Sequence, residues 1–170
     1  GIVDPVSDVE LITTELILRD LETVDKRLHK TGKKARSGDK EAVAEVALLD
    51  RLKTCLSEGQ SARTLRVSDD EFDILNELTL LTQKPILYVG NVPEENIEKG
   101  NDFSDALRQL AEKEAAECLL ISGKIEAEIA NLPPEDGALF LEEIGMKEPG
   151  LSRLIHASYQ MLGLLTFFTV

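Results

Sequence analysis

The chain has 170 residues, of which 42% are hydrophobic and 4% aromatic, and it carries a formal net charge of −13. This length allows one ordinary domain or two small ones, and the apolar fraction is sufficient for a buried core. The strong negative charge disfavours non-specific binding of nucleic-acid backbones or anionic membranes over most of the surface, so any contact with nucleic acid must be local.

The first third of the chain has the pattern of two long amphipathic helices. Apolar residues recur at helical spacing from Val9 onward, directly after Asp8, which can cap a helix, and Gly38-Asp39 can begin a second one. The pattern predicts an antiparallel helical hairpin. With roughly 30 residues in the first helix and a rise of about 1.5 Å per residue, its tip would project about 40 Å.

The turn between these helices is the one strongly basic stretch of this acidic chain. A solvated hairpin tip and an electrostatic contact with RNA both explain such a patch, and the sequence alone favours neither. The candidate partner-binding residues are Lys30, Lys33, Lys34 and Arg36.

The pattern stays helical up to about Gln83. The second helix is expected to end at residues 57–60, and Ser68 with Glu71 forms a capping-box signature at the start of a third helix that closes near Leu81. The change of composition near Gln83 is the best candidate for a domain boundary.

From Lys84 the pattern changes to two apolar strands separated by a helix. Residues 86–90 and 118–121 are short apolar runs bounded by turn residues, which is typical of buried parallel strands. Ser104 can cap the helix between them, and a strand, helix, strand succession implies a right-handed parallel unit. Further helices are expected over 125–132, from 133 and from 150 to 164.

Two polar turns follow these strands. The first contains Asn91, Val92 and Glu94, and the second contains Ser122, Gly123 and Lys124. Because the carboxyl ends of parallel strands meet at one edge of a sheet, where open α/β sheets bind ligands, we expect the turns to form one wall of a nucleotide site. The chain contains no Gly-x-x-x-x-Gly-Lys-Ser/Thr loop for the phosphates.

The other reactive residue types show no catalytic pattern. Cys55 and Cys118 lack metal-ligand spacing and are expected to be small core residues. His29 lies in the basic stretch, and His156 has no acid or thiol at nucleophile spacing. No catalytic residue and no metal ligand is therefore predicted. The paired acidic residues are interpreted as solvated helix surface, and they are Glu126, Glu128, Glu142 and Glu143.

Four separated blocks of the sequence resemble the Obg-like ATPases, also called the YchF family. The blocks occur in the family's order and span essentially the whole chain. The resemblance implies an α/β fold with a long helical insert, in which an antiparallel coiled-coil hairpin is joined to the C-terminal half of a Rossmann-like P-loop NTPase G domain with a parallel sheet. The blocks are VDP with DVELITTEL and DLETV (residues 3–24), KPILYVGNVPE (84–94), ISGKIE (121–126) and LGLLTFFT (162–169).

The resemblance also implies a division of the chain. Residues 1–83 would be the coiled-coil arm, with 1–7 leaving the G domain, residues 84–165 would be the C-terminal part of the G domain, and 166–170 would begin a TGS domain. The phosphate-binding loop and both switch segments would precede Gly1. Because hydrolysis depends on positioning the phosphates, this segment alone is expected to be inactive.

The nucleotide implied by the resemblance is ATP, with GTP bound more weakly. Ordinary GTPases carry Asn-Lys-x-Asp after this strand, and the Asp accepts two hydrogen bonds from guanine. Here Val92 replaces the Lys and Glu94 replaces the Asp, so guanine recognition should weaken, while backbone groups near Val92 could serve adenine N6 and N1. Asn91 would bind the base edge and buttress the loop.

The second turn, Ser122-Gly123-Lys124, matches the family's Ser-Ala-Lys turn, which helps to cover the purine, with Gly123 in place of Ala. The resemblance further implies that Mg²⁺ is bound by the full-length parent and not by this segment.

The resemblance implies a fragment of a cytoplasmic, ribosome-associated ATPase whose arm contacts ribosomal RNA or a ribosomal protein. No DNA partner is expected. No membrane partner is expected either, since the longest apolar run, near 161–170, is too short to span a bilayer. Two alternatives remain open, namely a helical interaction module that needs no nucleotide and a fragment without independent activity. An incomplete sheet would leave apolar strand faces exposed.

Overall fold

The computed structural model describes residues 3–165 and Phe167, and the chain divides into two compact units. One comprises Ser7–Lys84, and the other comprises the described residues on either side of it in the sequence. We call them the helical unit and the sheet unit. The predicted start of a TGS domain at 166–170 lies, apart from Phe167, outside the described residues.

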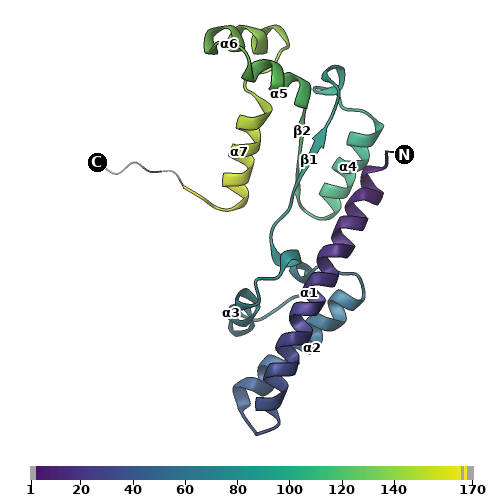
Figure 1. Ribbon diagram of the computed structural model, residues 1–170, viewed down its shortest axis with the longest axis vertical. Helices are drawn as coiled ribbons and strands as arrows, with labels where there is room; N and C mark the ends of the chain where they lie inside the picture. Colours follow the sequence, from purple (N-terminus) through teal and green to yellow (C-terminus); the bar gives the residue numbers. More distant parts are fainter. Residues whose placement is uncertain (1–2, 166, 168–170) are drawn as a thin grey trace. The chain divides into compact units, whose positions relative to one another are not determined.

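Two long helices, α1 (Pro5–Ala35) and α2 (Lys40–Ser57), dominate the helical unit and lie side by side (Figure 1). Their ion pairs show that they run in opposite directions. Arg27 contacts Glu45 in the first half of α2, whereas Asp25, further back on α1, contacts Lys53 in the second half at 2.7 Å. The predicted pair of amphipathic helices is therefore present.

The two helix starts differ in how well they were predicted. Asp39 caps α2 as expected, because its carboxylate accepts the N–H groups of Glu41 and Ala42. The prediction of Asp8 as the cap of α1 is wrong. The helix starts one turn earlier at Pro5, and Asp4 accepts the Val6 N–H at 3.1 Å. Proline is favoured at a first helical position because it has no N–H to satisfy there.

The rest of the helical unit consists of η1 (Ala62–Thr64), α3 (Asp69–Glu77) and η2 (Leu81–Gln83). The predicted capping box of Ser68 and Glu71 is present at the start of α3. The predicted end of this helix near Leu81 is wrong by about one turn, because Thr79 adopts a φ of 50°, a left-handed conformation that a right-handed helix cannot contain. Leu81 belongs instead to η2.

One continuous apolar core joins these elements. It consists of Ile17, Val24, Leu48, Leu49, Leu52, Leu56, Ala62, Leu75, Leu78 and Leu80. Inside the same unit, the Asp20 side chain is 2% exposed. Its carboxylate accepts hydrogen bonds from the Leu81 N–H, the Thr82 N–H and the Thr82 hydroxyl, each at 2.7 Å. Asp20 thus holds η2 against α1 in place of an apolar contact.

The sheet unit contains two parallel strands, β1 (Leu87–Asn91) and β2 (Glu117–Ile121), connected through α4 (Asp102–Lys113). The predicted strand, helix, strand succession is therefore present. The remaining elements are η3 (Glu94–Asn96), α5 (Gly123–Ala130), α6 (Pro134–Glu143) and α7 (Gly150–Met161). None of the helices in the described part of the chain is long and apolar enough to cross a membrane.

Helices α4 and α7 lie on either side of the two strands (Figure 1). A Cβ on Gly90 would come within 3.4 Å of Leu107 on α4, and a Cβ on Gly150 at the start of α7 would come within 2.9 Å of Ile121. Leu120, which is paired with Gly90, and Ile121 point to opposite faces because side chains alternate along a strand. Each face of the sheet thus has one helix packed against it.

The prediction of Ser104 as the cap of α4 is wrong. Asn101 is the cap, since its side-chain oxygen accepts the Ser104 N–H at 3.0 Å, and the Ser104 hydroxyl accepts the Asn101 N–H at 2.7 Å. Ser104 is therefore the third helical residue of a capping box, and the helix starts before it.

Candidate functional site

The two turns predicted to form a nucleotide site meet at one edge of the sheet. The strand register places Asn91 opposite Ile121, so both turns start at the same level. The ladder continues for one residue, because the Val92 N–H donates to the Ile121 carbonyl at 2.9 Å. A direct bond then links the turns, in which the Gly123 N–H donates to Asn91 Oδ1 at 2.9 Å.

The bond to Asn91 satisfies one of the N–H groups that the start of α5 leaves without a helical partner. Asn91 itself is exposed. Among the described residues its Nδ2 group has no hydrogen-bond acceptor, so this donor is available to a ligand. Asn91 can therefore buttress the second turn and bind a base edge at the same time.

Helix α5 begins at Gly123, two residues before its predicted start. Gly123 and Lys124 are consequently the first helical residues and not part of an extended loop. A Cβ on Gly123 would lie 3.5 Å from Asn91 Oδ1, which is an ordinary van der Waals distance. The turn would therefore accept alanine, the residue that the family resemblance leads one to expect here.

Val92 and Ser122 are buried, with 8% and 2% of their surface exposed. They can contribute to a ligand mainly through their backbone groups. The Val92 N–H already donates to Ile121, so adenine N1 would need a different donor. The Val92 carbonyl accepts no hydrogen bond from the described residues and is the better candidate for a base contact.

Glu94 and Lys124 form an ion pair across the two turns, with 3.0 Å between Glu94 Oε2 and Lys124 Nζ. Glu128, one turn further along α5, lies 3.8 Å from the same ammonium. The hydrogen bond to Glu94, followed by the charges of Glu94 and Glu128, raises the pKa of Lys124 above its ordinary value. The ammonium therefore remains charged at neutral pH, and it is engaged by the protein itself.

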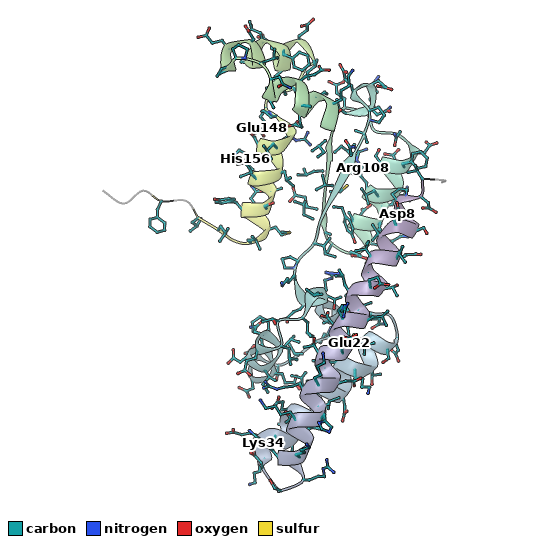
Figure 2. The ribbon with its side chains drawn as sticks, viewed as in Figure 1. Asp8, Glu22, Lys34, Arg108, Glu148 and His156 are labelled. Carbon is teal, nitrogen blue, oxygen red and sulfur yellow. The ribbon has the colours of Figure 1, made fainter. Side chains whose placement is uncertain are left out.

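The predicted partner-binding cations lie apart from these turns, in the helical unit. Lys30, Lys33, Lys34 and Arg36 are exposed, and none of them forms an ion pair with a described residue. Figure 2 shows Lys34 at the end of α1, next to the turn into α2. Arg27, closer to the core, differs because it contacts Glu45 and Glu77, and its pKa is raised, most strongly by the hydrogen bond to Glu45.

Two interpretations of polar residues outside the turns need revision. Glu126 was expected to be solvated surface, but its carboxylate accepts the N–H groups of Gly150 and Leu151 at 2.7 and 3.1 Å. His156 has an acidic neighbour, since Nδ1 lies 3.4 Å from Glu148, and both side chains are labelled on or near α7 in Figure 2.

The two cysteines, both expected to be core residues, differ in burial. Cys55 is buried as expected, whereas Cys118 is half-buried, and burial raises the pKa of its thiol. A raised pKa lowers the thiolate fraction and hence the reactivity. Within the described residues, no group of three or more His, Cys, Asp or Glu side chains could hold a metal ion.

Comparisons with known proteins identify relatives of the chain. No family model matches it. The protein named Ribosome-binding ATPase YchF from Bacillus subtilis is 44% identical over 171 residues, which cover 99% of this chain and 47% of that protein. The protein of the same name from Escherichia coli O157:H7 is 40% identical over 169 residues, covering 99% of this chain and 46% of that protein.

A solved structure gives the same result. The Schizosaccharomyces pombe YchF GTPase superposes with a TM-score of 0.88 and 27% sequence identity, covering 100% of this chain and 47% of that one. The chain thus spans about half the length of the relatives it matches. The resemblance predicted from the sequence motifs is confirmed, because the match extends over nearly the whole chain and fits a segment of the longer proteins.

Proposed function

We propose that this chain is a segment of a cytoplasmic YchF-family ATPase, and that it supplies the purine side of the nucleotide site together with a helical arm for a ribosomal partner. The observation that carries the proposal is the hydrogen bond between Asn91 and Gly123, which joins the two predicted base-reading turns. The relatives that match 99% of the chain are named ribosome-binding ATPases.

In this proposal, the two units are parts of a larger fold. The α1 and α2 pair, within residues 1–83, is the antiparallel coiled-coil arm, and residues 84–165 are the C-terminal half of a P-loop NTPase G domain. The parallel pairing of β1 and β2 and the position of both turns at the strand ends support this assignment. Residues 166–170 would begin a TGS domain.

The residues present fit an adenine base better than a guanine base. Adenine has an N6 donor, for which the Val92 carbonyl is available, whereas guanine needs a carboxylate held in place for its two adjacent donors, and Glu94 is one methylene longer than the Asp of ordinary GTPases. Asn91 Nδ2 can donate to a ring nitrogen, and the stem of Lys124 can cover the purine face. We therefore propose ATP as the preferred nucleotide and GTP as the weaker one.

The phosphates and Mg²⁺ would be bound by residues of the full-length protein outside this chain. When bound, Mg²⁺ would neutralise charge on the phosphates during hydrolysis. The turns described here would hold the base and thereby fix the position of the nucleotide. This segment alone would not hydrolyse ATP.

The proposed ribosomal contact is through the turn between α1 and α2, and we favour the phosphate backbone of ribosomal RNA as the partner. Arg27, Arg51 and Lys53 in the body of the helical unit pair with carboxylates. The four cations near the turn, Lys30, Lys33, Lys34 and Arg36, have no such partner among the described residues. Unpaired cations on an acidic protein are suited to a local contact with phosphates.

The nucleotide part is tested in the full-length protein by replacing Asn91 with Ala. Loss of the bond to Gly123 removes one hydrogen bond from the site, so we expect ADP affinity, measured by isothermal titration calorimetry, to fall up to about tenfold. Gly123→Ala is the matched control and should leave affinity unchanged. Equal affinity of the unsubstituted protein for ADP and GDP would contradict the adenine preference.

A nucleotide-independent interaction module is the second candidate function, and the unpaired cations favour it. Replacing Lys30, Lys33, Lys34 and Arg36 with Glu should abolish co-sedimentation with ribosomes under either function. The two functions differ for Asn91→Ala, which should affect ribosome binding only if nucleotide and ribosome binding are linked. Unchanged co-sedimentation of the charge-reversed protein would contradict the role of the arm in both.

A further inference from the structure

The Glu94 side chain is already engaged by another residue of the site in this structure. Glu94 is the first residue of η3, directly beyond β1, and Lys124 is the second residue of α5, directly beyond β2. Their parallel strands place both residues at the same edge of the sheet, where Glu94 Oε2 and Lys124 Nζ lie 3.0 Å apart. The pair therefore connects the two base-reading turns.

Lys124 is held in this position from two sides. Glu128 lies four residues further along α5, and its Oε1 atom is 3.8 Å from the ammonium. Spacing of four residues places both side chains on one face of the helix. The ammonium thus lies between two carboxylates, one from each of the elements that border the site.

A guanine base would need the carboxylate of Glu94, which Lys124 already contacts. Its Watson-Crick edge presents the N1–H and N2–H₂ donors side by side, and a carboxylate recognises them by accepting one hydrogen bond on each oxygen. In this protein one oxygen of Glu94 already accepts from Lys124. Each carboxylate oxygen has two acceptor sites, so guanine would have to share Oε2 with the ammonium, or displace it, in order to use both oxygens. Adenine lacks both donors and does not compete for Glu94.

We propose that Lys124 is a specificity-determining residue, which disfavours guanine by engaging Glu94, a carboxylate that adenine does not need. The inference rests on the proposed function, because it concerns the same nucleotide site. It assigns to Lys124 a role different from covering the purine, which would favour adenine and guanine alike. The matched substitution is Lys124→Met, since methionine is similar in length and lacks the charge.

The experiment measures the affinities of ADP and GDP for the full-length protein by isothermal titration calorimetry. We expect Lys124→Met to raise GDP affinity relative to ADP affinity about two- to fivefold, the range set by a solvent-exposed ion pair. Any loss of stem contact with the purine would act on both nucleotides alike, so the ratio of the two affinities is the readout. Glu128→Gln should give a smaller gain for GDP, because it removes only the more distant carboxylate. Lys124→Arg keeps a cation beside Glu94 and should retain the preference of the unsubstituted protein.

A double substitution separates this role from other effects of Lys124. If Lys124 acts by engaging Glu94, the gain in GDP affinity should disappear when Glu94→Gln is combined with Lys124→Met. Equal weakening of ADP and GDP by Lys124→Met, or no change in either, would overturn the inference while leaving the proposed function intact. Absence of ADP binding by the unsubstituted protein would contradict the proposed function itself.

Discussion

In the helical unit, α1, α2 and α3 surround a continuous core, whereas in the sheet unit two strands have no further neighbour among the described residues. The largest fully buried side chains, with the exception of Ile125, belong to the helical unit. None of its exposed large apolar residues belongs to this core, and they are Leu11, Ile12, Leu18, Val43, Phe72 and Leu81. The core of this unit is therefore complete within Ser7–Lys84.

The sheet unit exposes more large apolar side chains to solvent than the helical unit does. Val89 on β1 is 39% exposed although it belongs to a parallel strand, a type that is usually buried on both faces. Exposed apolar side chains also lie on α7, among them Leu151, Ile155 and Tyr159. Two parallel strands with open edges are marginal on their own. The difference leads us to expect that the helical unit is stable by itself and that the sheet unit is less stable by itself.

Separating the units would test this comparison most strongly. We expect a peptide of residues 7–84 to unfold cooperatively on heating and a peptide of residues 85–165 to show no cooperative transition, because only the first contains a closed core. Circular dichroism at increasing temperature measures both. A sharp transition in the second peptide would show that two strands with α4 and α7 suffice, and the comparison would then fail.

Replacing Asp20 should have the next largest effect, a loss of stability in the helical unit. Asp20→Ala leaves the donors of Leu81 and Thr82 without their acceptor, and an unpaired buried donor costs about 1–3 kcal/mol. We expect the free energy of unfolding, from urea denaturation, to fall by about 3–5 kcal/mol.

The matched control for Asp20 is Asp25→Ala, on the same helix. Asp25 is about half exposed and pairs with Lys53, and such surface pairs contribute about 1 kcal/mol or less. Similar losses for the two substitutions would mean that the buried carboxylate is no more important than an exposed one. The burial of Asp20 and its three hydrogen bonds would then not account for an additional contribution to the stability of the unit.

The local features of both units could be predicted from the sequence. Asp39 at the start of α2 and the pair of Ser68 and Glu71 at the start of α3 act within three residues, so the sequence contains the whole interaction. The two apolar runs predicted β1 and β2, and the parallel arrangement placed Asn91 close to Gly123. Errors at Asp8 and Ser104 arose because a better cap, Asp4 or Asn101, lies a few residues earlier.

Contacts between distant residues could not be predicted. The bonds of Asp20 span 61 and 62 residues, and the bond from Gly150 to Glu126 spans 24. Nothing in the local pattern distinguishes these carboxylates from solvated ones. The engagement of Glu94 by Lys124 has the same origin, since it depends on strand register and not on either motif alone. The sequence thus indicated which turns meet, but not which of their polar groups are already occupied.

The smallest expected effect concerns Glu71, at the start of α3. The Ser68 N–H donates to its carboxylate at 3.0 Å, and Arg51 contacts it at 2.6 Å. The hydrogen bond from Ser68, followed by that from Arg51, lowers the pKa of Glu71 below its ordinary value of 4.5. Folding therefore favours the charged form. The resulting stability is present above pH 4.5 and is lost as the pH falls through the lower pKa of the folded state.

Replacing Glu71 with Gln should remove this part of the pH dependence. Gln can still accept the Ser68 N–H but carries no charge for Arg51, so we expect the variant to be less stable at neutral pH and the difference to shrink below about pH 4. Urea midpoints measured across this range provide the test. Asp70→Asn removes a carboxylate from the same helical turn without removing a hydrogen bond to a described residue, and so controls for the helix dipole. If both variants changed the pH profile equally, the charge at the helix start would explain the effect, and the specific contacts of Glu71 would not.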